Sequence, residues 1–135
     1  MATSVVLDAS ALLRAFVDQE PQAVDWLDRV ADGQVLPAWP AHLYVEVAHS
    51  LVRLTRARRL ERNRATDALG RTLAVPANVR SLKSLAAEAF AVGLERGVSA
   101  YDAAYVVLAE ALQAPLVTAD RQLADATEQG VLLPG

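Results

Sequence analysis

The sequence predicts an α/β fold, a three-layer α/β/α domain around a central parallel sheet. Short apolar runs rich in β-branched residues alternate with longer helical stretches along the whole chain. Strands separated by helices pair in parallel, and strands that are apolar on both faces need helices above and below the sheet. The length of 135 residues and the 53% hydrophobic content predict one domain, residues 1–135, with a buried core. The order of the strands is not predicted.

The first half of the chain is expected to supply two strands and four helices. Ser4–Asp8 is apolar and β-branched, which is typical of a buried strand, and Gln34–Pro37 is a weaker second strand. Pro21 suits the first turn of a helix because its missing N–H is not needed there. The helices are predicted at Ala9–Val17, Pro21–Ala31, Pro40 to about Arg59, and near Arg62–Leu73.

The second half is expected to continue the alternation. One predicted helix, Ser81–Arg96, stops at Gly97, and the next, Ser99–Leu112, stops near Pro115. The remaining elements are a strand at Leu116–Thr118, a short helix at Arg121–Ala126 and a last strand at Val131–Leu133.

The composition excludes several classes of function. The chain has no cysteine, so disulfides, thiolate zinc sites and cysteine nucleophiles are impossible. The net charge of −3 argues against a generic binder of polyanions, and an aromatic content of 5% argues against a base-stacking surface. No apolar run is long enough to span a membrane, and residues 1–8 lack the basic region of a signal peptide. We therefore expect a cytoplasmic protein that does not bind membranes.

Two acidic residues follow predicted strands. Asp8 ends the first strand, and Asp120 comes directly after the strand Leu116–Thr118. In doubly wound sheets the carboxyl ends of the strands form the crevice in which ligands bind. Each residue taken alone is better explained as the cap of the helix that follows it.

Asp102 interrupts a helix that is otherwise apolar nearly all round. Such a helix is expected to be buried, and a buried carboxylate is costly unless it is paired, hydrogen-bonded or bound to a metal ion. The alternative is a capping box formed by Ser99 and Asp102. The sequence favours neither explanation over the other.

Glu46 lies among apolar neighbours in the long predicted helix, on one stripe with His42, His49 and Arg53. The simplest explanation is a solvated stripe with an internal Glu–Arg pair. The spacing of Glu46 and His49 also occurs in di-iron bundles, but those need a second such pair and this chain has only two histidines.

The four acids together indicate a metal centre more strongly than any one of them alone. Converging carboxylates repel each other and raise each other's pKa, and a divalent cation removes that conflict. Oxygen ligands without cysteine favour Mg²⁺ or Mn²⁺, which can activate water for attack on a phosphate. The convergence itself follows from the predicted fold and not from the sequence directly.

A basic segment balances these acids. Without the four acids, 13 basic residues face 12 acidic ones, which leaves +1. Guanidinium groups suit phosphates. The alternatives are a solvated helix–turn–helix face, which we favour, and a docking surface for an acidic partner. The arginines concerned are Arg53, Arg56, Arg58, Arg59, Arg62 and Arg64.

Four segments in this order resemble the PIN-domain ribonucleases, specifically the VapC toxins of type II toxin–antitoxin pairs. Each motif alone is loose, but the ordered set covers nearly the whole chain. The resemblance implies a PIN-like fold for the domain. The segments are Val6–Leu12, the helix around Tyr44–Val47, Ser99–Tyr105 and Leu116–Asp120.

The resemblance also implies site residues. The family's acidic quartet falls on Asp8, Glu46, Asp102 and Asp120, which would be catalytic and would bind Mg²⁺ or Mn²⁺ directly or, for Glu46 and Asp120, also through water. Ser10 and Thr118 match hydroxyl positions that often line such sites, and their alternative is local capping and turn bonding. Asp125 would add charge at the rim or lie on the surface, and the role of His49 stays open.

The implied activity is metal-dependent hydrolysis of an RNA phosphodiester bond by activated water, leaving a 5′-phosphate and a 3′-hydroxyl. The implied partners are an RNA, with tRNA or rRNA as candidates, a second copy of the chain, and an inhibitory VapB-like antitoxin. The antitoxin would place a basic side chain in the acidic cleft and a helix in an apolar groove. Candidates for that groove, most of which we expect in the core instead, are Leu12, Leu13, Phe16, Trp26, Leu27, Leu43 and Leu51.

Other functions stay open to different degrees. A PIN nuclease acting in RNA processing or on DNA outside toxin–antitoxin systems fits the same residues. A catalytically silent PIN-fold binding module is less consistent, because all four acids are present. A phosphoacceptor signalling domain is disfavoured, because Asp8 has no acidic neighbour and the only lysine, Lys83, lies within a predicted helix.

Overall fold

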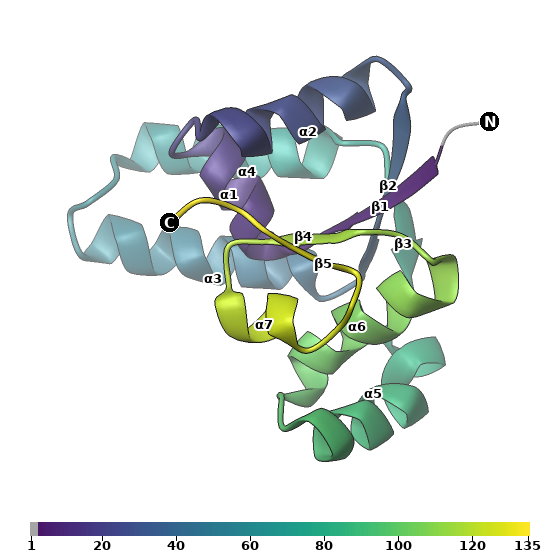
Figure 1. The fold of residues 1–135 in the computed structure, drawn as a ribbon. Helices are drawn as coiled ribbons and strands as arrows, with labels where there is room; N and C mark the ends of the chain where they lie inside the picture. The colour runs from purple at the N-terminus through teal and green to yellow at the C-terminus, as the bar shows by residue number, and fades with distance from the viewer. Residues whose placement is uncertain (1–2) are drawn as a thin grey trace.

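Strands and helices alternate along the chain in the computed structural model, which describes residues 3–135 (Figure 1). The strands are β1 (Thr3–Leu7), β2 (Val35–Pro40), β3 (Asn78–Arg80), β4 (Leu116–Thr118) and β5 (Gly130–Leu132). The helices are α1 (Ala9–Phe16), α2 (Pro21–Ala31), α3 (Leu43–Arg56), α4 (Arg62–Ala74), α5 (Leu82–Arg96), α6 (Ala100–Leu112) and α7 (Arg121–Asp125).

All five strands are parallel and form one sheet in the order β3-β2-β1-β4-β5. The helices α1, α2 and α4 gather on one side of this sheet, and α5, α6 and α7 lie on the other (Figure 1). The centre of β1 is fully buried because its residues are apolar on both faces. The predicted three-layer α/β/α architecture is confirmed.

Local capping chemistry sets several helix ends where the sequence predicted them. The Oγ atoms of Ser81 and Ser99 accept hydrogen bonds from the first turns of α5 and α6. Gly97 ends α5 in the left-handed conformation, at a φ of 69°, which glycine adopts without a steric penalty. Because these signals involve only neighbouring residues, the helix ends could be predicted from the sequence.

The region around residue 40 differs from the prediction. The strand β2 runs on to Pro40, where a helix was expected to begin, and α3 starts only at Leu43 and ends at Arg56. The edge strand β3 was not predicted. Its three residues are at most half-buried, so they lack the apolar run that marks the inner strands.

No helix within residues 3–135 combines the length and the apolar composition that a membrane crossing requires.

Candidate functional site

The strand order brings the ends of β1 and β4 together. After β1 the chain moves outward through β2 and β3, and it then returns to place β4 on the other side of β1. This reversal is the point at which open parallel sheets bind ligands, outside the carboxyl ends of the strands. Asp8 follows β1 and Asp120 follows β4, so both acids lie at this edge, as predicted.

Asp8 is buried and accepts three hydrogen bonds. Its Oδ1 atom accepts from the Ser10 hydroxyl at 2.7 Å and from the Ala11 amide at 3.0 Å. Its Oδ2 atom accepts from the Thr118 hydroxyl at 2.7 Å. Asp8 is therefore the cap of α1, and its carboxylate also contacts Thr118 at the end of the neighbouring strand β4.

The same hydroxyls organise the loop after β4. The Ala119 amide donates to Ser10 Oγ at 2.8 Å, and the Asp120 amide donates to Thr118 Oγ1 at 3.0 Å. The exposed carboxylate of Asp120 accepts from the Gln122 amide at 2.9 Å and caps α7. The local bonding expected of Ser10 and Thr118 is present, and it orients Asp8 at the same time.

Glu46 enters the site from α3 and is held by a tyrosine. The Tyr105 hydroxyl, from α6, donates to Glu46 Oε1 at 2.6 Å. His42 Nε2 lies 3.6 Å from the same oxygen and 3.0 Å from the carbonyl oxygen of Tyr101. The Glu–Arg pair considered for this stripe is thus replaced by contacts to Tyr105 and His42.

Asp102 lies in the first turn of α6, where its backbone amide donates to Ser99 Oγ at 3.1 Å. This is one of the two bonds of a capping box. The carboxylate is half-buried, and its pKa is raised mainly by burial and then by the negative charges of Asp120 and Glu46. Ser99 therefore caps α6 through the Asp102 amide, and the Asp102 carboxylate lies within the field of two other acids.

The pKa of Asp8 shows how these charges affect one another. Loss of solvation raises it from 3.8 to about 6, hydrogen bonds from Ser10, Thr118 and Ala11 oppose the rise, and the charge of Glu46 adds to it. The pKa of Tyr105 lies well above its usual value, because the hydroxyl is buried beside Glu46, Asp8 and Asp102. The fold thus gathers four carboxylates, and we call Asp8, Glu46, Asp102 and Asp120 the carboxylate site.

The donor set of the carboxylate site fits a hard divalent cation. Its ligand atoms are oxygens, and its acids raise one another's pKa, a conflict that a cation would relieve. Among residues 3–135, no three histidine or acidic side chains approach closely enough to share one ion. Mg²⁺ commonly uses one or two carboxylates and keeps several waters, so it does not need such a cage.

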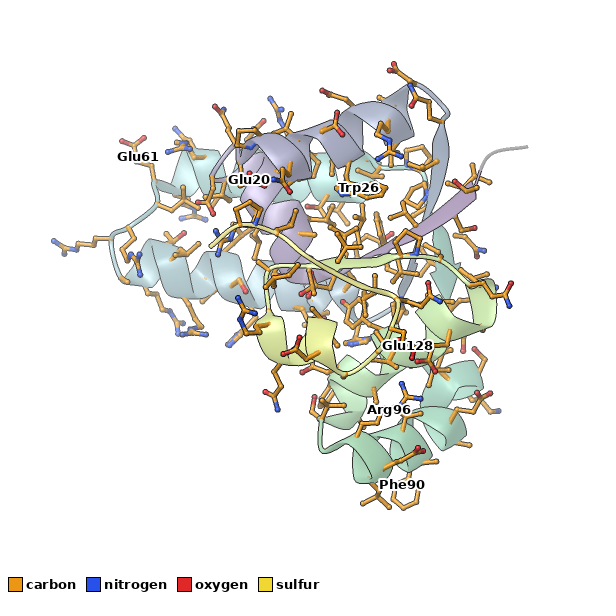
Figure 2. All side chains as sticks on the ribbon, in the orientation of Figure 1. Glu20, Trp26, Glu61, Phe90, Arg96 and Glu128 are labelled. Carbon is orange, nitrogen blue, oxygen red and sulfur yellow. The ribbon has the colours of Figure 1, made fainter. Side chains whose placement is uncertain are left out.

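The arginine cluster lies at the turn between α3 and α4, which we call the hairpin tip (residues 53–64). All six arginines are exposed, and nitrogen-tipped side chains surround the turn beside Glu61 (Figure 2). Arg64 donates to the carbonyl oxygen of Val17 at 3.1 Å. Arg53 and Arg59 border one hollow, whereas Arg56 and Arg62 border another.

Two further candidate residues, Asp125 and His49, gain no place in the carboxylate site. Asp125 ends α7 and lines hollows beside Arg96, so it does not extend the carboxylate site. His49 is exposed on α3, and the di-iron alternative for Glu46 and His49 gains no second histidine pair from the fold.

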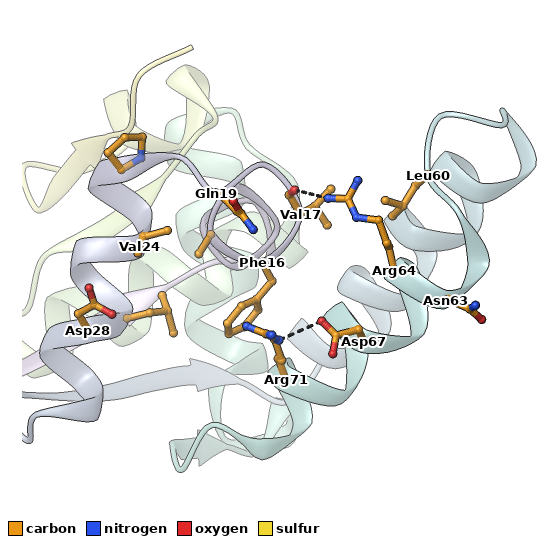
Figure 3. Close-up of a pocket in the computed structure, with 13 residues that line it drawn as sticks. Phe16, Val17, Gln19, Val24, Asp28, Leu60, Asn63, Arg64, Asp67 and Arg71 are labelled. Carbon is orange, nitrogen blue, oxygen red and sulfur yellow. Dashed lines mark hydrogen bonds and ion pairs between the residues drawn. The ribbon is translucent and has the colours of Figure 1, made fainter.

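The candidates for an apolar groove divide into two groups. Leu12 and Leu43 are fully buried, as expected of core residues, and Leu51 is buried in the core but also borders a groove between α3 and α4. Phe16 and Leu27 do line an open groove of about 660 Å³ between α1, α2 and α4, together with Val17, Val24 and Leu60 (Figure 3). Leu13 and Trp26 are partly buried against the core, with the Arg29 guanidinium 4.2 Å from the Trp26 ring centre.

Two residues of the site had no assigned role from the sequence. Tyr105 belongs to the quoted segment Ser99–Tyr105, and His42 belongs to the stripe with Glu46, but neither was expected to contact Glu46 across the site. The available signal was spacing: Tyr105 lies three residues after Asp102, on the same face of α6. The contact with Glu46 spans 59 residues, which no local pattern reveals.

Comparisons with known proteins identify the family and the fold. The PIN domain family matches residues 5–129. The chain is 36% identical over 124 residues to Ribonuclease VapC3 of Pyrobaculum aerophilum, which covers 90% of this chain and 92% of that protein. It superposes on the crystal structure of PAE2754 from Pyrobaculum aerophilum with a TM-score of 0.72 and 25% identity, covering 96% of this chain and 83% of the other.

Two more distant structures share the fold. VapBC2 from Rickettsia felis, bound to a DNA fragment from its promoter, gives a TM-score of 0.66 at 13% identity and covers 96% of this chain and 97% of the other. A toxin–antitoxin complex from Klebsiella pneumoniae gives 0.56 at 14% identity and covers 94% and 95%.

Proposed function

Because this chain belongs to the PIN domain family, we propose that it is a metal-dependent ribonuclease and the toxin of a type II toxin–antitoxin pair. The similarity to Ribonuclease VapC3 supports the ribonuclease activity, and the folds of the two toxin–antitoxin structures are compatible with the toxin role. Residues 1–135 act as one nuclease domain in the cytoplasm, where the RNA is. The observation that best supports this proposal is that four acids, from the end of β1, from α3, from α6 and from the loop after β4, lie at one edge of the sheet.

The residues divide the work as follows. Asp8 and Asp102 would hold Mg²⁺ or Mn²⁺, and Glu46 and Asp120 would bind it directly or through water. When bound, the ion supplies an activated water and neutralises charge on the phosphate. Ser10 and Thr118 fix the orientation of Asp8, and Tyr105 fixes that of Glu46. Asp120 is exposed and its charge raises the pKa of Asp102, so Asp120 would be the carboxylate available to orient a water or take a proton from it.

The test is cleavage of a total RNA pool by the purified protein with Mg²⁺ or Mn²⁺. We expect fragments with 5′-phosphates, no cleavage in EDTA, and no cleavage by Asp8→Asn. The matched control is Asp125→Asn, which makes the same chemical change away from the carboxylate site and should cut normally. Uncut RNA in every lane would contradict the nuclease and leave a silent binding module.

The partners follow from the same proposal. The groove of Phe16, Val24 and Leu27 accepts an apolar helix of a VapB-like antitoxin. Co-purified antitoxin should protect RNA in the cleavage assay, and Val24→Glu should abolish that protection without slowing cleavage.

The homodimer follows from the family resemblance alone. Light scattering should give twice the chain mass of 14.4 kDa, and a monomer would contradict the dimer.

A further inference from the structure

Helix α3 carries groups of opposite charge along one line of its surface. Glu46 and Arg53 are seven residues apart, so they differ by only about 20° around the helix axis and by about 10 Å along it. Ser50 lies between them on the same flank, four residues after Glu46. A rigid helix thus fixes the separation between the carboxylate site and the first arginine of the hairpin tip.

A hollow opens on this flank next to Arg53. It has a volume of about 340 Å³ and is lined by Ser50, Arg53, Leu54, Ala57 and Arg59. Within residues 3–135, neither Arg53 nor Arg59 has an acidic partner within 4.0 Å. Two unpaired guanidinium groups and a hydroxyl in one depression match the donors that bind a phosphate group.

The other arginines of the hairpin tip differ from this pair. Arg56 and Arg62 border a separate groove between α3 and α4 with an apolar lining that includes Leu51 and Leu69. Arg64 is engaged with the Val17 carbonyl on the side of α1. The six arginines are therefore not equivalent, although the sequence presents them as one cluster.

We propose that Ser50, Arg53 and Arg59 form a phosphate subsite for the RNA strand that is cut at the carboxylate site. This inference rests on the proposed nuclease function. The subsite holds another phosphate of the same strand, because Glu46 and Arg53 share one line of α3 and are about 10 Å apart along its axis. The carboxylates repel an RNA backbone, so an adjacent cationic contact is needed to hold the strand against the site.

The binding test compares two pairs of charge-removing substitutions. A labelled single-stranded RNA of mixed sequence is titrated in EDTA, from about 50 to about 200 mM salt, and binding is read by fluorescence anisotropy. Arg53→Gln with Arg59→Gln should weaken binding and reduce the salt slope by about 0.7 for the lost phosphate contact. Arg56→Gln with Arg62→Gln removes the same charge and should keep the slope. Equal slopes in both pairs, or no binding by the unsubstituted protein, would overturn the subsite.

The cleavage test separates the subsite from the nuclease activity. In Mg²⁺, the Arg53 and Arg59 pair should raise KM and leave kcat unchanged, because the arginines do not touch the scissile phosphate. If the unsubstituted protein cuts RNA and both pairs have the same KM, the subsite falls and the nuclease stands. If nothing is cut, the nuclease falls, and anisotropy still decides the subsite.

An acidic protein is the competing occupant of this hollow. Poly-glutamate serves as the probe in the same anisotropy assay, by displacement of the labelled RNA. Loss of poly-glutamate binding with unchanged RNA binding in the Arg53 and Arg59 pair would assign the hollow to an acidic protein and overturn the proposal. Loss of RNA binding with little effect on poly-glutamate supports it.

Discussion

The carboxylate site and the hairpin tip lie at two ends of the same helix and hold their charges in opposite ways. In the carboxylate site, Asp8 is buried with three hydrogen-bond donors around it, and Glu46 is fixed by Tyr105. At the hairpin tip the arginines are exposed, and Arg53 and Arg59 have no acidic partner among the described residues.

This difference separates two uses of charge. A buried carboxylate is oriented but destabilises the fold, as the raised pKa of Asp8 indicates. An exposed guanidinium destabilises little and acts over the Debye length, which is about 8 Å at physiological salt. We therefore expect substitutions in the carboxylate site to change chemistry and stability, and removal of the exposed charges of Arg53 and Arg59 to change binding with little effect on stability.

The largest expected effect comes from Asp102→Asn. Under the proposed function, loss of one charge of the carboxylate site should lower kcat/KM for RNA cleavage by about a thousandfold, which corresponds to roughly 4 kcal/mol. Circular dichroism should show an unchanged fold, since the backbone bond to Ser99 remains. Full activity would remove Asp102 from the carboxylate site.

The next effect is a pH dependence of stability carried by Asp8. Its folded pKa of about 6 lies above the unfolded value of 3.8, so its contribution is fully present below 3.8 and is lost as the pH rises through 6. Asp8→Asn cannot titrate. Relative to the unsubstituted protein, its unfolding free energy should rise by on the order of 3 kcal/mol from pH 4 to pH 7.

Urea unfolding in EDTA at several pH values measures this difference. Arg53→Gln, at the hairpin tip, provides the comparison and should show the same pH dependence as the unsubstituted protein. A constant difference between Asp8→Asn and the unsubstituted protein across this range would mean that burial does not raise the pKa of Asp8.

A smaller effect is expected for Tyr105→Phe. The substitution removes the hydroxyl that donates to Glu46, and it should cost about 1–2 kcal/mol of unfolding free energy. Tyr101→Phe is the matched control, because Tyr101 is 66% exposed, and it should cost less than about 0.5 kcal/mol. Equal costs in thermal unfolding would show that the bond to Glu46 contributes nothing.

The smallest effect is expected at the turn of the hairpin tip. Arg58 has a φ of 57°, a left-handed conformation that is unfavourable for a residue with a Cβ atom. Arg58→Gly should raise the unfolding free energy by about 0.5 kcal/mol, since relief of strain slightly exceeds the entropy cost of glycine. A loss of stability in urea unfolding would show that the Arg58 side chain fixes the turn.

Much of the fold was predictable because its signals are local. Asp8, Ser99 and Gly97 mark helix ends through bonds or conformations that involve only a few residues, and the inner strands are recognisable as apolar runs. The strand β3 was missed because an exposed edge strand of three residues has no such pattern. Pro37 and Pro40 also weaken the strand signal of β2, since proline donates no hydrogen bond.

The carboxylate site likewise has a part that could be predicted from the sequence and a part that could not. The four acids were predicted from strand ends, interrupted apolar helices and the family resemblance, and Ser10 and Thr118 were predicted from the resemblance alone. The roles of Tyr105 and His42 were not identified, because their contacts to Glu46 and Tyr101 join elements 59 residues apart. The sequence also could not show that the six arginines lie in different surroundings, because this depends on the path of the turn between α3 and α4.

The hydrogen bond between Thr118 and Asp8 has a consequence for timing. It joins residues 110 positions apart. At a synthesis rate of about 5–20 residues per second, Thr118 is added roughly 5–20 s after Asp8. During that interval a nascent chain carries Asp8 without its partner strand β4, so the carboxylate site cannot be complete until residue 118 has been added.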